Sequence, residues 1–141
     1  MLRTALIAAI ATLSVIPATT AIAHDDKTAY VTNNTTYDFT GGYVQNKKNV
    51  TITGMPVTIK AGQGVSFEID IKKKSDFTAD LHWLINDEVG TSVAIKYKST
   101  SSGIQCHTDV PEGIHSDHYD CNSDHPKWYF CDASSESDCD K

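Results

Sequence analysis

The chain has 141 residues and a formal net charge of −6, with 18 acidic residues against 12 lysines and arginines. That length suits one domain with a core of its own. The negative charge disfavours nucleic acid as a partner, because phosphate binding needs a basic surface.

The first 23 residues have the three parts of an export signal. Arg3 supplies a short positive start, an apolar run follows over residues 5–16, and Pro17 interrupts it. Residues 21–23 read Ala-Ile-Ala, an A-x-A cleavage site, so we expect a secreted mature chain, extracellular or periplasmic, that begins at His24. The alternative, a retained membrane anchor, would need about 20 consecutive apolar residues, and this run is shorter.

Residues 24–104 form a body in which short extended segments alternate with turns. Segments 29–32, 37–39, 50–53 and 57–60 are β-prone, and Asn-Asn, Gly-Gly and Gly-Met-Pro sequences separate them. These residues favour turns because they tolerate positive φ or pre-set the backbone. The pattern predicts several short strands.

The clearest strands follow in the second half of the body. Apolar and polar residues alternate strictly over 65–72, which is typical of a strand with one buried and one solvated face. Segments 77–85 and 93–98 repeat the pattern, and no helical periodicity is present. We predict an all-β fold, a single-domain antiparallel β-sandwich, with a small barrel as the alternative. We expect its core to include Phe67, Ile69, Leu81, Trp83 and Ile95.

Residues 105–141 form a tail of different composition. The tail holds all four cysteines, four of the six histidines and nine acidic residues against two lysines. We expect it to be loop-rich and to complete the same domain, with one closing strand over 127–131.

The cysteines Cys106, Cys121, Cys131 and Cys139 follow an export signal, so we expect them to form disulfides. Four cysteines allow three pairings. We favour Cys106 with Cys121 and Cys131 with Cys139, because each bridge then closes a short loop. A zinc site is the alternative, but the C-x-x-C pair of zinc ribbons and fingers is missing.

Histidines are the candidate metal ligands. His115 and His118 would share a face on a helical turn and, with His125 or an aspartate, could bind zinc or copper. His24, as the mature N-terminus, could chelate copper through its amine and ring, with His82 as the second imidazole. The alternatives are exposed histidines with no cofactor, and a pH-sensing role at about pH 6.

Sequence motifs for catalysis are missing, since the chain has no G-x-S-x-G, H-E-x-x-H or phosphate loop. We therefore expect a non-enzymatic protein. Asn33, Asn34 and Asn49 stand in N-x-T sequons, which carry glycans only in a eukaryotic secretory pathway, and the sequence leaves that question open.

Residues 31–39 contain the end of a predicted strand and an Asn-Asn-Thr turn, and a Gly-Met-Pro break at 54–56 and the segment 59–63 follow. Over about residues 28–70 this order resembles the opening of aegerolysin-like and insecticidal-crystal-protein-like sandwiches. The resemblance implies a secreted one-domain β-sandwich that recognises membrane lipid, sometimes with a pore-forming or toxic partner. The export signal and the tail have no counterpart in that pattern, so it assigns no lipid-binding residue.

We therefore predict a secreted binding module whose target is a membrane or cell surface. The candidate contacts are the aromatic residues Tyr37, Tyr43, Tyr119 and Trp128, because amphipathic rings lie well at an interface, although Trp128 fits core packing better. The alternatives are a secreted copper- or zinc-binding protein and a small exported inhibitor that binds a protein partner.

Overall fold

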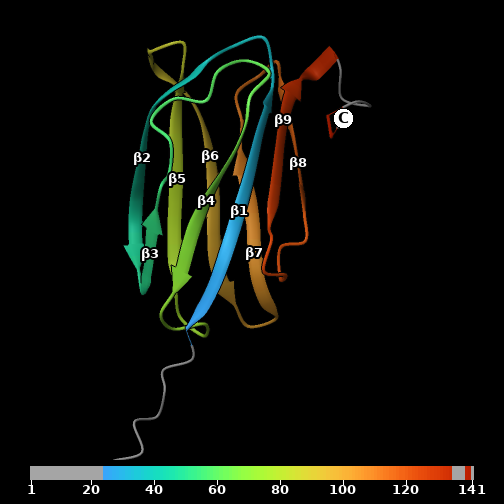
Figure 1. Cartoon of the computed structure of the whole chain (residues 1–141). Helices are drawn as coiled ribbons and strands as arrows, with labels where there is room; N and C mark the ends of the chain where they lie inside the picture. The colour runs from blue at the N-terminus through green and yellow to red at the C-terminus, as the bar shows by residue number, and fades with distance from the viewer. Residues whose placement is uncertain (1–23, 135–138, 141) are drawn as a thin grey trace, which may run out of the picture.

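The computed structural model describes residues 24–134 and 139–140, and the predicted export signal lies outside them. Strands make up the regular structure of these residues, in a five-stranded sheet of order β3-β4-β1-β9-β8 and a four-stranded sheet of order β2-β5-β6-β7 (Figure 1). The strands are β1 (Asp25–Asn34), β2 (Phe39–Lys48), β3 (Val50–Thr53), β4 (Gly64–Ile71), β5 (Thr78–Ile85), β6 (Glu88–Thr100), β7 (Gly103–Asp109), β8 (Ile114–Tyr119) and β9 (Lys127–Asp132).

The inner faces of the two sheets share one hydrophobic core, as the alternating patterns predict. In β4, Phe67 and Ile69 are buried, and in β5, Leu81 and Trp83 are buried, while their neighbours in sequence face outward. Burying one face of each sheet is the main favourable term for such a fold. The predicted β-sandwich is therefore confirmed.

The tail, residues 105–141, holds more strands between its loops than the single closing strand that the sequence predicted. It contributes β7 to the four-stranded sheet, and β8 and β9 to the five-stranded sheet. The closing strand predicted over 127–131 is β9, which pairs antiparallel with β8 and parallel with β1. The sequence pattern did not predict strand β8, because its sequence, Ile-His-Ser-Asp-His-Tyr, has polar residues on both faces. A strand at the edge of a sheet can form without alternating apolar and polar residues, because its backbone hydrogen bonds to β9 hold it in an extended conformation.

The predicted strand over 57–60 is also absent, and only Ile59 forms an isolated bridge, with Phe39 of β2. The amide of Gly42 donates to the carbonyl of Val57 (2.9 Å), so this loop covers part of the free edge of β2. The approach is close, because a Cβ on Gly42 would lie 2.6 Å from the carbonyl oxygen of Pro56. Glycine at this position is therefore a packing requirement.

The Asn-Asn-Thr turn after β1 is built around a buried amide. The Nδ2 of Asn33 donates to the carbonyls of Tyr37 (2.8 Å) and Ile59 (3.0 Å). Its Oδ1 accepts from the backbone amide (3.1 Å) and the hydroxyl (2.6 Å) of Thr35. Asn33 is 0% exposed, so a glycan on this sequon is incompatible with the fold.

An aromatic column in the core contains the unpaired hydroxyl of Tyr97. The Tyr97 ring packs on Phe77 (centroids 5.4 Å apart) and Trp128 (5.6 Å), and its hydroxyl has no hydrogen-bond partner among the described residues. Burial, followed by the charges of Asp25 and Asp124, raises the pKa of this phenol far above its usual value. An unpaired buried polar group is destabilising.

Replacing Tyr97 with phenylalanine should therefore leave the free energy of unfolding unchanged or raise it by up to about 1 kcal/mol at neutral pH. The unfolded chain releases the phenol proton at about pH 10, whereas the folded protein holds it to higher pH. The free energy of unfolding is therefore unaffected by this group below about pH 10 and decreases as the pH rises above that value. Urea unfolding at neutral and alkaline pH should show a shallower alkaline loss for the variant. A marked destabilisation at neutral pH would show that the hydroxyl has a partner.

Candidate functional site

The four cysteines form two disulfides in the pairing favoured from the sequence. Cys106 bonds to Cys121, with Cα atoms 5.8 Å apart, and Cys131 bonds to Cys139, with Cα atoms 5.1 Å apart. The first bridge joins β7 of one sheet to the connection between β8 and β9 of the other. Two disulfides are compatible with an extracellular or periplasmic location.

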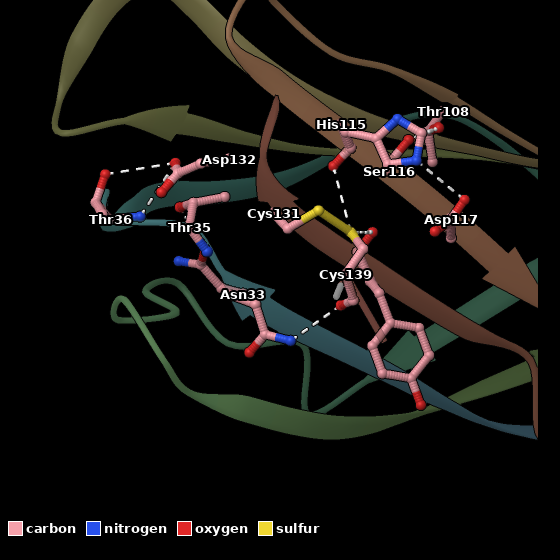
Figure 2. The surroundings of a disulfide bond; sticks show 12 residues. Asn33, Thr35, Thr36, Thr108, His115, Ser116, Asp117, Cys131, Asp132 and Cys139 are labelled. Carbon is pink, nitrogen blue, oxygen red and sulfur yellow. Dashed lines mark hydrogen bonds and ion pairs between the residues drawn. A yellow bond between two sulfur atoms is a disulfide. The ribbon is translucent and has the colours of Figure 1, made fainter. Parts of the chain in front are cut away.

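The second disulfide holds the end of the chain against the five-stranded sheet (Figure 2). The sulfur of Cys139 lies 3.8 Å from the carbonyl oxygen of His115 on β8 and 3.7 Å from that of Tyr129 on β9. The side-chain amide of Asn34 on β1 donates to the carbonyl of Cys139 (3.0 Å). Residues 139 and 140 are thus held next to three neighbouring strands.

Three tyrosines gather on the outer face of β1, β9 and β8, because the register of these strands brings outward positions together. Tyr30 is opposite Lys127, which is opposite Tyr119, and Tyr129 lies two residues further along β9. Tyr119 and Tyr129 meet edge to face at 5.8 Å, and Tyr30 meets His125 at 6.1 Å. Tyr30 is 40% exposed and Tyr119 43% exposed. We name Tyr30, Tyr119, Tyr129, His125 and Lys127 the tyrosine face.

One end of the tyrosine face contains a recess of about 250 Å³. Its charges are mixed, since the Lys127 ammonium lies 3.7 Å from the Asp120 carboxylate. The pKa of Tyr119 is raised, first by desolvation and then by the charge of the nearby Asp140. The recess is lined by Tyr119, Asp120, Lys127, Tyr129 and Asp140.

The predicted metal ligands lie on separate parts of the fold. His24 bonds to Asp70 (3.1 Å), and this contact lowers the pKa of that carboxyl. His82 stacks on Tyr43, with ring centroids 5.1 Å apart, on the outer face of the other sheet. His24 directly precedes β1 and His82 lies on β5, so the two histidines are next to different sheets.

The three tail histidines are also distributed over different surroundings. His115 and His118 lie on β8, a strand and not the helical turn that the chelate hypothesis requires, so they are not a helical pair. His115 contacts Asp117 (3.2 Å), and His118 lines a recess beside the Cys106–Cys121 bridge. His125 belongs to the tyrosine face. Among the described residues, no three histidine, cysteine or acidic side chains form a group that could hold a metal ion.

The aromatic residues proposed from sequence lie in four different environments. Trp128 is buried, so core packing is confirmed for it, while Tyr37 is exposed after β1 and Tyr43 is exposed on the four-stranded sheet. Only Tyr119 belongs to the tyrosine face. Sequence reasoning missed Tyr30 and Tyr129, although alternation would have found them, because each is flanked by two core residues.

No protein-family model and no curated protein matches the chain. The resemblance to aegerolysin-like sandwiches therefore stays a prediction. Within the described residues, no helix is long and apolar enough to span a bilayer.

Removing the second disulfide tests how the chain end is held. Replacing both Cys131 and Cys139 with alanine should lower the free energy of unfolding by about 2.5 kcal/mol in the chain-entropy model, because the bridge closes a loop with a sequence separation of 8. The matched control replaces Cys106 and Cys121, whose separation is 15, and should cost about 3 kcal/mol. Urea denaturation measures both variants. A cost well below about 1 kcal/mol for the first pair would show that the bridge contributes little to stability.

Proposed function

We propose that the protein is an exported, non-enzymatic binding module that recognises a membrane surface through the tyrosine face. The observation that carries the proposal is the gathering of Tyr30, Tyr119 and Tyr129 on one sheet face. A tyrosine ring with an apolar body and a polar hydroxyl is well suited to the layer between water and hydrocarbon. The resemblance to aegerolysin-like sandwiches favours the same target.

The charges around the tyrosine face favour a membrane without net negative charge. Asp117, Asp120 and Asp140 surround Tyr119 and Tyr129, and Lys127 is the one cation among the described residues that line the recess. Anionic lipids would be repelled by this excess of carboxylates, whereas zwitterionic lipids would not. We therefore expect binding to zwitterionic bilayers.

Vesicle co-sedimentation tests the proposed function. The oxidised protein should pellet with phosphatidylcholine vesicles, and replacing Tyr30 and Tyr119 together with serine should weaken binding about tenfold, because two interfacial rings are lost. The matched control replaces Tyr37 and Tyr43, which are 41% and 42% exposed but lie outside the tyrosine face. This control should bind like the unchanged protein. Failure to pellet with any lipid mixture, or equal loss in both double variants, would refute the proposal.

A further inference from the structure

We infer that the recess between Tyr119 and Tyr129 binds the phosphocholine head group of a zwitterionic phospholipid, with the quaternary ammonium against the two rings. This inference rests on the proposed function and names the ligand of the same face. It follows from three features of the recess: the ring arrangement, the carboxylates and the lysine.

The two rings form adjoining walls for a bulky cation. Their planes are inclined by 72° and their centroids are 5.8 Å apart, so one ring presents its edge to the other and the rings do not stack. The negative face of an aromatic ring attracts a cation that lies within about 6 Å of its centroid. A quaternary ammonium has no N–H to donate, so rings are better partners for it than hydrogen-bond acceptors alone.

The carboxylates of Asp140 and Asp120 add the negative charge that such a cation needs. Asp140 lines the recess together with Tyr119 and Tyr129, so its carboxylate lies near the ring pair. The Cys131–Cys139 disulfide keeps this residue there, because Asp140 directly follows Cys139. These negative charges attract a cation to the space beside the rings and repel an anion from it.

Lys127 supplies the complementary charge for the phosphate. Its side chain is 39% exposed, and its ammonium lies 3.7 Å from Asp120, a distance too long for a strong hydrogen bond. The register places Lys127 in the row between Tyr30 and Tyr119, toward the middle of the tyrosine face. The recess thus offers rings and carboxylates for the positive charge of a zwitterion and, beside Asp120, an ammonium for its negative charge. A bare metal ion fits less well, since the described residues contain no cluster of three or more acidic, cysteine or histidine side chains that could hold one.

The experiment titrates the oxidised protein with soluble phosphocholine and with vesicles. Phosphocholine should saturate a site that shifts the ring NMR signals of Tyr119 and Tyr129, and phosphoethanolamine should bind at least threefold more weakly. Phosphatidylcholine vesicles should bind at least tenfold better than phosphatidylglycerol vesicles, and excess phosphocholine should compete with them.

Substitutions at Tyr119 separate a cation–ring contact from general apolarity. Tyr119→Phe keeps the ring and should bind phosphocholine within about threefold of the unchanged protein, whereas Tyr119→Leu should bind about tenfold more weakly. Asp140→Asn should also weaken binding severalfold. Tyr43→Leu, at an equally exposed tyrosine on the other sheet, is the matched control and should change nothing.

The outcomes distinguish this inference from the proposed function. The inference would be overturned, and the proposed function would stand, if vesicle binding were the same for different head groups, were not reduced by phosphocholine and were unchanged in Tyr119→Leu. Saturable phosphocholine binding at Tyr119 and Tyr129 without vesicle binding would support the inference and refute the proposed function. The absence of both kinds of binding would overturn both.

Discussion

Replacing Asn33 with alanine should lower the free energy of unfolding by about 3–4 kcal/mol, because four hydrogen bonds of a buried side chain are lost together. The amide of Asn33 joins the turn after β1 to the loop that covers β2, through the carbonyls of Tyr37 and Ile59. Its loss leaves the buried amide of Thr35 without its acceptor. Urea denaturation followed by circular dichroism measures the change.

The neighbouring Asn34 is the control for this substitution. It is only partly buried, and its amide donates to the carbonyl of Cys139 (3.0 Å). Asn34→Ala should cost about 1 kcal/mol. If Asn33→Ala cost no more than Asn34→Ala, the hydrogen bonds of Asn33 would not be what holds this turn.

Replacing Lys27 with methionine should lower the free energy of unfolding by about 3 kcal/mol, because the partly buried Asp25 carboxylate then keeps only the exposed Lys74 ammonium, 3.6 Å away. Lys27 lies on the inner face of β1 and is 2% exposed. Its ammonium is 3.1 Å from the carboxylate of Asp25 and 3.4 Å from that of Asp124. Methionine nearly retains the shape of the lysine side chain but not its charge. The change in the free energy of unfolding therefore measures mainly the effect of the lost charge on the carboxylates.

A double substitution tests this explanation. Removing Asp25 as well, in Lys27→Met with Asp25→Ala, should recover most of the loss, since a buried ion pair replaced as a whole costs far less than a broken one. Together with the single variant Asp25→Ala, these two variants form a double-mutant cycle, which urea denaturation measures. Strictly additive losses for the two substitutions would contradict the proposed pairing of Lys27 with Asp25.

The strands that the sequence identified are those whose pattern is local. In β4 and β5, alternate residues enter the core, and a period of two needs no knowledge of the rest of the chain. The predictions for strand β8 and for the segment at Ile59 were wrong for the opposite reason. The conformation of each depends on a partner distant in sequence: β9 for β8, and Phe39 for Ile59.

The same distinction applies to the candidate site. Alternation around Tyr30 and Tyr129 is sufficient to predict that both side chains face outward, and Tyr119 was already a candidate. That the three share one surface follows only from the strand order β1-β9-β8, including the parallel pairing of β1 with β9. Nothing in the sequence specified that pairing.

The two-faced strands and, through the cysteine spacing, the favoured disulfide pairing were predictable from the amino-acid sequence, because alternation and short loops are properties of neighbouring residues. Which outward residues meet depends on the three-dimensional strand order, since residues 97 positions apart, such as Tyr30 and Lys127, become neighbours through backbone hydrogen bonds that any sequence can form. The tyrosine face and its recess are products of that strand order.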